Sequence, residues 1–166
     1  MKYAVMDIEG IALAKERIHP PRGRYSNVHN CMRKIGIELY DGRSRVFEFV
    51  PCVSKNQLTK KEWRAFRYCK KHIHHLDFEP VGASTVCIDG NDEVMNFFRV
   101  NDIEIILFKG GTIERDFCFL TGFESRNLED FGMRKAPKEL GHDPLLEVKF
   151  YHGEFKKLMS GNILPD

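Results

Sequence analysis

Two acids near the N-terminus have the spacing of a metal-binding pair. Asp7 and Glu9 follow a short apolar run and are separated by Ile8. On a β-strand, residues two apart project from the same side, so the two carboxylates would stand together. Neighbouring carboxylates repel each other, and a bound divalent cation such as Mg²⁺ or Mn²⁺ removes that repulsion. Two acids at the solvent-facing end of a strand are the alternative, and this short motif alone does not decide between them.

Three residues further along the chain could complete such a site. Glu114 falls in the first turn of a predicted helix, shortly after a Gly-Gly break. His142 and Glu147 are separated by four residues at the start of the last predicted helix. A histidine with its ordinary pKa of about 6.5 can act as a base near neutral pH. The spacing to Glu147 favours that role for His142 over that of an isolated surface histidine.

A second group of metal-binding residue types lies in the segment C-K-K-H-I-H-H. Its members are Cys69, His72, His74 and His75, with Cys52 upstream. Positions 69 and 72 share one face of a helix, so this Cys/His pair could bind zinc. No second paired motif supplies the remaining ligands. A helix end whose cationic residues favour the helix dipole is therefore the preferred interpretation.

Apolar periodicity and turn signals predict the elements that position these residues. Strands are predicted at residues 2–7, 34–40, 45–50, 102–108 and 126–130. Helices are predicted at residues 59–76, 91–100, 112–120 and 143–159. Asp41-Gly42 joins the second and third strands as a hairpin turn, and residues 10–33, which contain two prolines, are predicted to form a loop.

Two helix starts carry specific capping signals. Thr59 and Glu62 form a capping-box pattern, and Asp143 precedes Pro144 as an N-cap. A hairpin followed by alternating helices and strands predicts an α/β fold. Its central sheet would be mixed, an antiparallel hairpin plus parallel strands, flanked by helices in one domain spanning residues 1–166. In such sheets, sites gather at strand ends and helix starts, which is where the candidate residues fall.

These motifs resemble those of the DEDDh class of 3′–5′ exonucleases, which have a ribonuclease H-like fold. Asp7 and Glu9 match the first motif of that family, at the end of the first strand. The second motif, an acid opening a helix after a buried strand, is matched by K-G-G-T-I-E, which ends at Glu114. His142 and Glu147 match the third, a histidine followed five positions later by an acid. The resemblance extends from residue 2 to about residue 155.

The resemblance implies hydrolysis of phosphodiester bonds with two divalent cations, Mg²⁺ or Mn²⁺. Asp7 would bridge the two ions. Glu9, Glu114 and Glu147 would complete their coordination. His142 would take the proton from the attacking water as general base.

Two departures from the family pattern affect the choice of ligands. Glutamates stand at both later positions where the family has aspartates, and the interval between the second and third motifs is short. Asp116 is therefore an alternative to Glu114 as the third ligand. Asp143 competes with Glu147, although the proline that follows it favours Asp143 as a helix cap.

Substrate contacts are expected at two places beside these acids. The resemblance places Gly10 and Ile11 against the terminal sugar and base of the substrate. Lys109 and Gly110 precede the helix of Glu114, where backbone could approach a nucleotide closely. For Lys109, a plain turn between strand and helix is the favoured alternative.

A local excess of positive charge lies between residues 15 and 34, against a single acid, Glu16. Its basic residues are Lys15, Arg17, His19, Arg22, Arg24, His29, Arg33 and Lys34. Cations such as Arg22 and Arg24 could follow a phosphate backbone, and a solvated loop is an equal alternative.

Composition limits the remaining possibilities. The chain has 166 residues and a net charge of +2, which alone does not identify a nucleic-acid partner. No apolar stretch is long enough to cross a membrane, and the first residues lack a signal-peptide pattern. Five widely spaced cysteines indicate a reducing compartment, cytoplasm or nucleus. We expect a nucleic-acid partner, RNA rather than DNA, and no membrane; the sequence predicts no oligomeric state.

Two other functions fit the same sequence. The first is a catalytically inactive nucleic-acid-binding module on the same fold, like the Maelstrom-type domain, which has lost its standard metal acids. Acids at all the expected positions favour an active enzyme over this module. The second is a protein-interaction domain in which the Asp-x-Glu pattern is incidental. Stabilisation by a divalent cation would separate the enzyme from both.

Overall fold

The computed structural model describes residues 1–10, 32–49, 56, 58–73, 75, 85–86, 91–110 and 112–161. A six-stranded sheet has the strand order β4-β3-β2-β1-β5-β6. The strands are β1 (Tyr3–Gly10), β2 (Met32–Leu39), β3 (Ser44–Phe49), β4 (Thr85–Val86), β5 (Ile105–Phe108) and β6 (Glu124–Asn127). The helices are α2 (Lys60–His72), α3 (Asn91–Val100), α4 (Thr112–Thr121) and α5 (Pro144–Met159), with short 3₁₀ helices η4 (Leu128–Phe131) and η5 (Lys138–Leu140).

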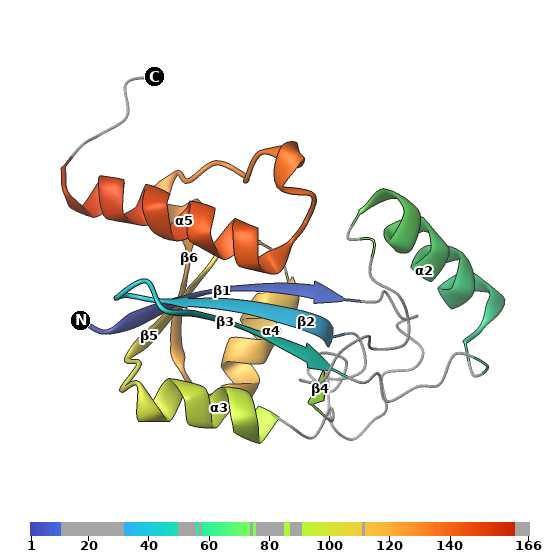
Figure 1. The fold of residues 1–166 in the computed structure, drawn as a ribbon, viewed down its shortest axis with the longest axis horizontal. Coiled ribbons are helices and arrows are strands. Elements are labelled where there is room, and N and C mark those ends of the chain that lie inside the picture. Colours follow the sequence, from blue (N-terminus) through green and yellow to red (C-terminus); the bar gives the residue numbers. More distant parts are fainter. Residues whose placement is uncertain are drawn as a thin grey trace.

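Strand β1 lies where the antiparallel and parallel parts of the sheet meet. It pairs antiparallel with β2, and β2 pairs antiparallel with β3. On its other side β1 pairs parallel with β5, which pairs parallel with β6. Helices flank the sheet in Figure 1. The mixed α/β fold class is therefore confirmed.

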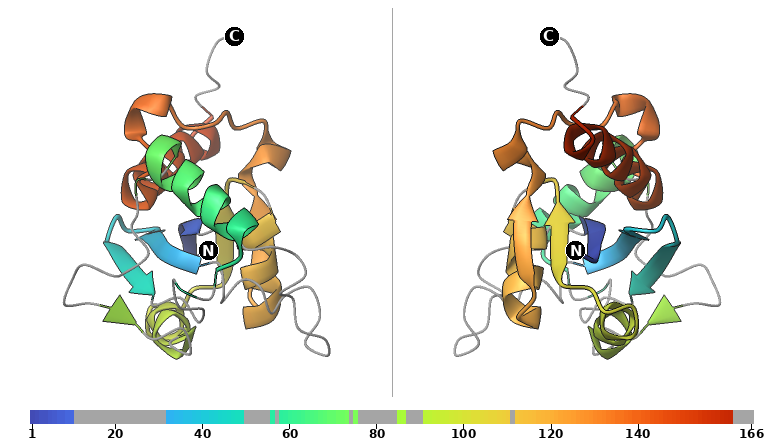
Figure 2. Two further views of the ribbon diagram at one scale, coloured as in Figure 1. Left: turned by 90° about the vertical axis from the view of Figure 1, so that its right-hand side faces the viewer. Right: turned by 90° about the vertical axis from the view of Figure 1, so that its left-hand side faces the viewer.

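The side chains of β1 alternate between two apolar layers, because successive residues of a strand point to opposite faces. Met6 and Ile8 belong to the layer beneath α3 and α4, together with residues such as Phe98 and Phe117. Val5 belongs to the layer beneath α5. Figures 1 and 2 show α5 and α3 on opposite sides of the sheet. Asp7 and Glu9 share the parity of Val5, so the fold turns both acids toward α5.

Some predicted element ends need correction. β1 continues to Gly10 rather than stopping at Asp7, so both acids lie within the strand. The strand predicted at residues 126–130 is wrong in its second half. There the Asn127 side chain accepts a hydrogen bond from the Glu129 amide at 3.0 Å and opens η4 instead. The sequence does not predict β4, because two residues are too few to show periodicity.

Helix α2 begins where the sequence predicts, but it ends early. The hydroxyl of Thr59 accepts from the Glu62 amide at 3.3 Å, and the Thr59 amide donates to the Glu62 carboxylate at 2.8 Å. The capping box is therefore confirmed. The last helical residue is His72, and the predicted extension to residue 76 is wrong because Ile73 already has non-helical backbone angles. None of the described helices combines the length and the apolar character needed to span a membrane.

Candidate metal centre

Asp7 and Glu9 are the residues of the site that lie on β1. Asp7 is only 5% exposed, and its Oδ2 atom is buried without a hydrogen-bond partner. The pairing with β2 shifts register between Glu9 and Gly10. Such irregularities are frequent beside active sites, because they redirect side chains at the end of a strand. An orphaned buried carboxylate oxygen is costly, and a bound cation would satisfy it.

Gly36 allows the start of α5 to lie close to these acids. It lies on β2 directly opposite Asp7. A Cβ atom at this position would stand 2.3 Å from the carbonyl oxygen of Pro144, so no larger residue fits without moving backbone. The sequence analysis did not single out Gly36. A glycine inside a strand is nonetheless a signal of close backbone approach, and this one allows the contact between helix and sheet.

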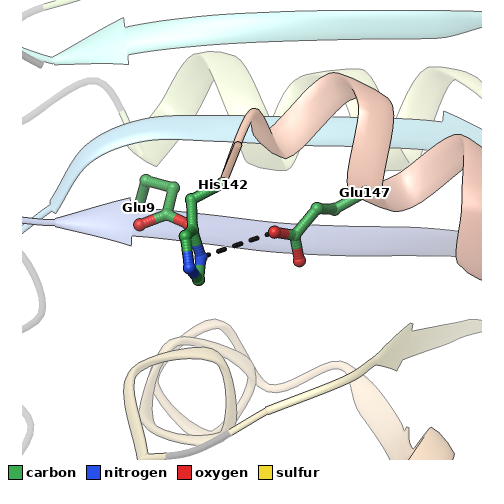
Figure 3. A group of neighbouring side chains, drawn as sticks. All are labelled: Glu9, His142 and Glu147. Carbon is green, nitrogen blue, oxygen red and sulfur yellow. Dashed lines mark ion pairs between the residues drawn. The ribbon is translucent and has the colours of Figure 1, made fainter. Parts of the chain in front are cut away.

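The first turn of α5 and the residue before its cap supply the other side of the site. Asp143 caps the helix, its Oδ1 accepting hydrogen bonds from the amides of Leu145 at 2.9 Å and Leu146 at 3.2 Å. This confirms Asp143 as the cap. His142 has a φ of 54°, an uncommon conformation for a residue with a side chain. Glu147 lies one turn into the helix and points toward β1 (Figure 3).

The ligand atoms of Glu9, His142 and Glu147 lie within 4.8 Å of one another, and in the described part of the chain they form the group suited to a metal ion. His142 Nδ1 is 3.4 Å from Glu9 Oε1 and 3.5 Å from Glu147 Oε1. Figure 3 shows the imidazole beside both carboxylates. The two carboxylates are 12% exposed and the imidazole is 51% exposed. Solvent therefore reaches the histidine more readily than the acids.

Glu114 approaches from α4. Its side chain is buried, and a Cβ atom at Gly110 would lie 3.3 Å from its Oε2 atom. Gly110 has a φ of +148°, which residues with side chains rarely adopt. Gly110 therefore turns the chain and also leaves room for the Glu114 carboxylate. The side chain of Asp116, the alternative ligand, lies outside the described part of the structure.

The electrostatics of the site are dominated by like charges. Burial raises the pKa of Asp7 well above its ordinary value, and Glu147, Glu9, Glu114 and Asp143 raise it further. Burial and the other acids raise the pKa of Glu9 to about 8. Burial also raises the pKa of Glu147, although His142 opposes this shift. These acids come from β1, α4 and α5, so the fold itself collects the negative charge.

Tyr151 is a further residue of the site that the sequence analysis did not identify. Its hydroxyl donates to Glu147 Oε2 at 3.4 Å and accepts from the amide of Ala136 at 3.0 Å. Glu147 and Tyr151 are four residues apart, so they meet on one face of α5. Tyr151 therefore orients the Glu147 carboxylate. Its helical spacing from Val148 and Phe155 offered no signal beyond that of a core residue.

The predicted substrate contacts are only partly placed. Gly10 ends β1 next to Glu9, and Gly110 adjoins Glu114. Lys109 is buried and its ammonium pairs with Glu129, so its predicted contact with the substrate stays a prediction. Ile11, Arg22 and Arg24 lie outside the described residues.

Two of the other charged candidates lie in β2, and Lys34 stands opposite Glu9 in the pairing of β2 with β1. Arg33 is buried and lies in β2 rather than in the predicted loop, because the strand begins at residue 32. Lys34 lies in this strand as predicted, and it pairs with Glu48 at 3.5 Å. Of the residues considered for zinc, Cys52 and His74 lie outside the described residues. Among the described residues, no group of cysteine and histidine side chains is close enough to hold a metal.

The acids present fit hard divalent cations. Asp7, Glu9 and Glu147 offer carboxylate oxygens, Glu114 lies near enough to raise the pKa of Asp7, and Asp7 Oδ2 has no other partner. Mg²⁺ and Mn²⁺ favour this oxygen-rich donor set, and zinc would more often recruit sulfur or several histidines. Glu147, Glu9, Glu114 and Asp143 all raise the pKa of Asp7, so Asp7 meets the negative charge of the whole group.

No protein-family model and no curated protein matches the chain. Among solved structures, the family B DNA polymerase from the hyperthermophilic archaeon Pyrobaculum calidifontis is similar, with 14% sequence identity and a TM-score of 0.30. The alignment covers 74% of this chain and 11% of the polymerase. A similarity this weak assigns no function, so the functional argument depends on the site.

Proposed function

We propose that the chain is a metal-dependent 3′–5′ exonuclease that hydrolyses phosphodiester bonds of nucleic acid, with RNA favoured over DNA. The observation that carries the proposal is the group of Glu9, His142 and Glu147, whose ligand atoms lie within 4.8 Å of one another, beside Asp7, whose buried Oδ2 atom has no hydrogen-bond partner. So much buried negative charge costs folding free energy unless cations bind there. The resemblance of the three acidic motifs to the exonuclease class supplies the reaction.

Each residue has a role that follows from its environment. Asp7, Glu9, Glu114 and Glu147 would hold two ions, either Mg²⁺ or Mn²⁺. When bound, such ions supply Lewis-acid stabilisation of the negative charge that develops on a phosphate during hydrolysis. The buried carboxylates are fixed by β1, α4 and α5, so they need little reorganisation to bind.

His142 would act as general base. Its half-exposed ring can accept a proton from the attacking water and return it to solvent, which a buried group cannot easily do. Glu9 and Glu147 beside Nδ1 stabilise the imidazolium that this transfer produces. Tyr151 holds Glu147 in place for that interaction.

The decisive experiment is a degradation assay on the full chain. Single-stranded RNA and DNA with a 5′ label are incubated in Mg²⁺, Mn²⁺ or EDTA, beside an Asp7→Ala variant. Glu124→Gln serves as a matched control, since it removes an exposed acid on β6 far from the site. We expect a ladder that shortens from the 3′ end, needs a metal, persists in Glu124→Gln and disappears in Asp7→Ala. Equal inertness of all three proteins would reject catalysis.

A further inference from the structure

Helix α2 is strongly cationic. Its thirteen residues, Lys60–His72, include the basic side chains Lys60, Lys61, Arg64, Arg67, Lys70, Lys71 and His72. Its one acid, Glu62, is buried and is used by the capping box at Thr59. The positive charge of this helix is therefore not balanced within the helix itself.

Four of the seven basic residues of α2 lie on one face. Lys60, Arg64, Arg67 and Lys71 are spaced four, three and four residues apart, so they form a single stripe along the helix. All four are exposed. The stripe is about 16 Å long, at 1.5 Å per residue. The opposite face carries Phe66, which is buried. This arrangement keeps the stripe in solvent, and we name it the cationic stripe.

An exposed aromatic side chain lies beside the cationic stripe. Tyr68 is 61% exposed. The ring of His72 lies 5.0 Å from that of Tyr68, with an angle of 40° between the planes. Both residues belong to the C-terminal half of α2, next to Lys71. Tyr68 therefore presents a flat surface that a nucleic-acid base could stack on.

The C-terminal turn of α2 lies near the acidic site. Burial raises the pKa of the Cys69 thiol, and the Glu9 carboxylate raises it further. Figure 1 shows α2 beyond the end of β1, beside the start of α5, and the left view of Figure 2 shows it crossing in front of that end of the sheet. A strand whose 3′ end lay among the acids could thus continue over α2.

We propose that α2 binds single-stranded nucleic acid, with phosphates along the cationic stripe and an unstacked base on Tyr68. This inference rests on the proposed function for the position of the 3′ end in the acidic site. Phosphates give the stripe its complementary charge, and an exposed ring beside the stripe favours unpaired bases over a duplex or an acidic peptide.

The test measures binding without catalysis. Fluorescence anisotropy of a 5′-labelled 12-nucleotide RNA and the corresponding DNA is followed with the full chain in EDTA. Arg64→Gln combined with Arg67→Gln should weaken binding on the order of tenfold near 0.1 M salt. It should also make the plot of log affinity against log salt shallower by about 1.4, since each single-strand phosphate contact contributes about 0.7.

The matched control is Arg99→Gln combined with Lys156→Gln. It removes the same charge from exposed sites on α3 and on the C-terminal part of α5. The control should bind like the wild type. Tyr68→Ala should weaken binding about fivefold or more. Tyr68→Phe should bind like the wild type, because stacking needs only the ring. Thermal melting of each variant checks that the fold is intact.

The outcomes separate this inference from the proposed function. If both double variants weaken binding equally, or if a glutamate-rich peptide of the same charge competes as well as the oligonucleotide, α2 is not a nucleic-acid site. Absence of binding by the wild type has the same meaning. If α2 behaves as expected but no strand is degraded with any metal, the exonuclease proposal fails and the binding site stands.

Discussion

Two groups of polar residues include side chains of β1 and α5, and they differ in their balance of charge. One is the acidic cluster, Asp7, Glu9, Glu114 and Glu147, with His142 at its rim. The other is a hydrogen-bonded group of Tyr3, His152 and Glu38, which we name the His152 network. Both use side chains from β1 and α5, and each contains a histidine near a carboxylate. Their surroundings give them opposite properties.

In the His152 network, nearly all the polar atoms find hydrogen-bond partners within the group. His152 Nδ1 lies 2.6 Å from Glu38 Oε1, and its Nε2 atom lies 3.0 Å from the hydroxyl of Tyr3. The histidine side chain is 2% exposed. The Glu38 carboxylate and the Tyr3 hydroxyl occupy the two ring nitrogens of His152, and within this group only Glu38 Oε2 is left without a partner. Such a network ties β1, β2 and α5 together without needing a ligand.

The acidic cluster has the reverse arrangement. Several carboxylates repel one another, and its histidine contacts two of them at 3.4 and 3.5 Å, longer than a good hydrogen bond. The comparison teaches that a carboxylate and a histidine do not by themselves mark a functional site. Surplus charge of one sign, together with access to solvent, distinguishes a site prepared for a ligand from one that stabilises the fold.

The largest difference should appear on replacing Asp7 by Asn. We expect turnover to fall on the order of a thousandfold, because metal stabilisation of charge is worth several kcal/mol and each 1.36 kcal/mol is tenfold. Adding Mn²⁺ at a hundred times Kd should raise the free energy of unfolding of the wild type by about 2.7 kcal/mol, and this gain should shrink in the variant. Glu38→Gln should retain both properties. An unchanged Mn²⁺ response in Asp7→Asn would remove Asp7 from the metal site.

The pH dependence of the metal-free chain should expose the repulsion in the acidic cluster. The pKa of Glu9 is about 8 in the folded chain, above its ordinary value of 4.5, so the folded state holds more protons between these values. The free energy of unfolding in EDTA should therefore fall by a few kcal/mol as pH rises from about 4.5 through 8. Urea titrations across this range would measure it. Glu9→Gln should flatten the slope, and an equally steep slope in that variant would contradict the assignment.

Gly36 lies between the two groups, opposite Asp7 and two residues from Glu38. Gly36→Ala should destabilise the fold by about 1–3 kcal/mol, because its Cβ would collide with the Pro144 carbonyl and lift the start of α5. Its affinity for Mn²⁺ should also fall. Gly153→Ala is the matched control. Nothing lies within 4 Å of its added Cβ, and it should stabilise α5 by about 0.5–1 kcal/mol in thermal melting.

Substitutions that break the His152 network should affect stability alone. His152→Leu leaves Glu38 buried without its main partner, which costs about 1–3 kcal/mol, or more if the carboxylate stays charged. Turnover per folded molecule should remain normal well below the melting temperature. The double variant His152→Leu with Glu38→Leu should recover part of the loss, since it leaves no carboxylate without a partner. A double variant less stable than the single one would argue against this account.

Tyr151→Phe should have the smallest effect. It removes the hydroxyl that contacts Glu147 and the Ala136 amide, at a cost of about 0.5–1.5 kcal/mol in stability. Turnover should drop by a few-fold, through a looser Glu147. Steady-state kinetics beside Tyr40→Phe, which lies at the other end of the β1–β2 pair, would reveal whether the loss is specific.

Local patterns in the sequence were enough to predict most elements and part of the site. The Asp7-x-Glu9 spacing determined that both acids share one face of a strand, and Asp143-Pro144 determined where α5 begins. The capping box at Thr59 did the same for α2. These features depend on contacts between residues close in the chain, so they can be predicted from it.

Only the tertiary structure decided which of the acids meet and which charges are balanced. Asp7 and Glu147 are 140 residues apart in number, and the close approach of α5 to Gly36 is what brings them together. Neither the pairing of His152 with Glu38 nor the burial of Lys109 beside Glu129 has a local signature. Burial and long-range charge depend on packing between distant segments. The sequence by itself therefore determined the candidates, and the fold decided which of them became a site.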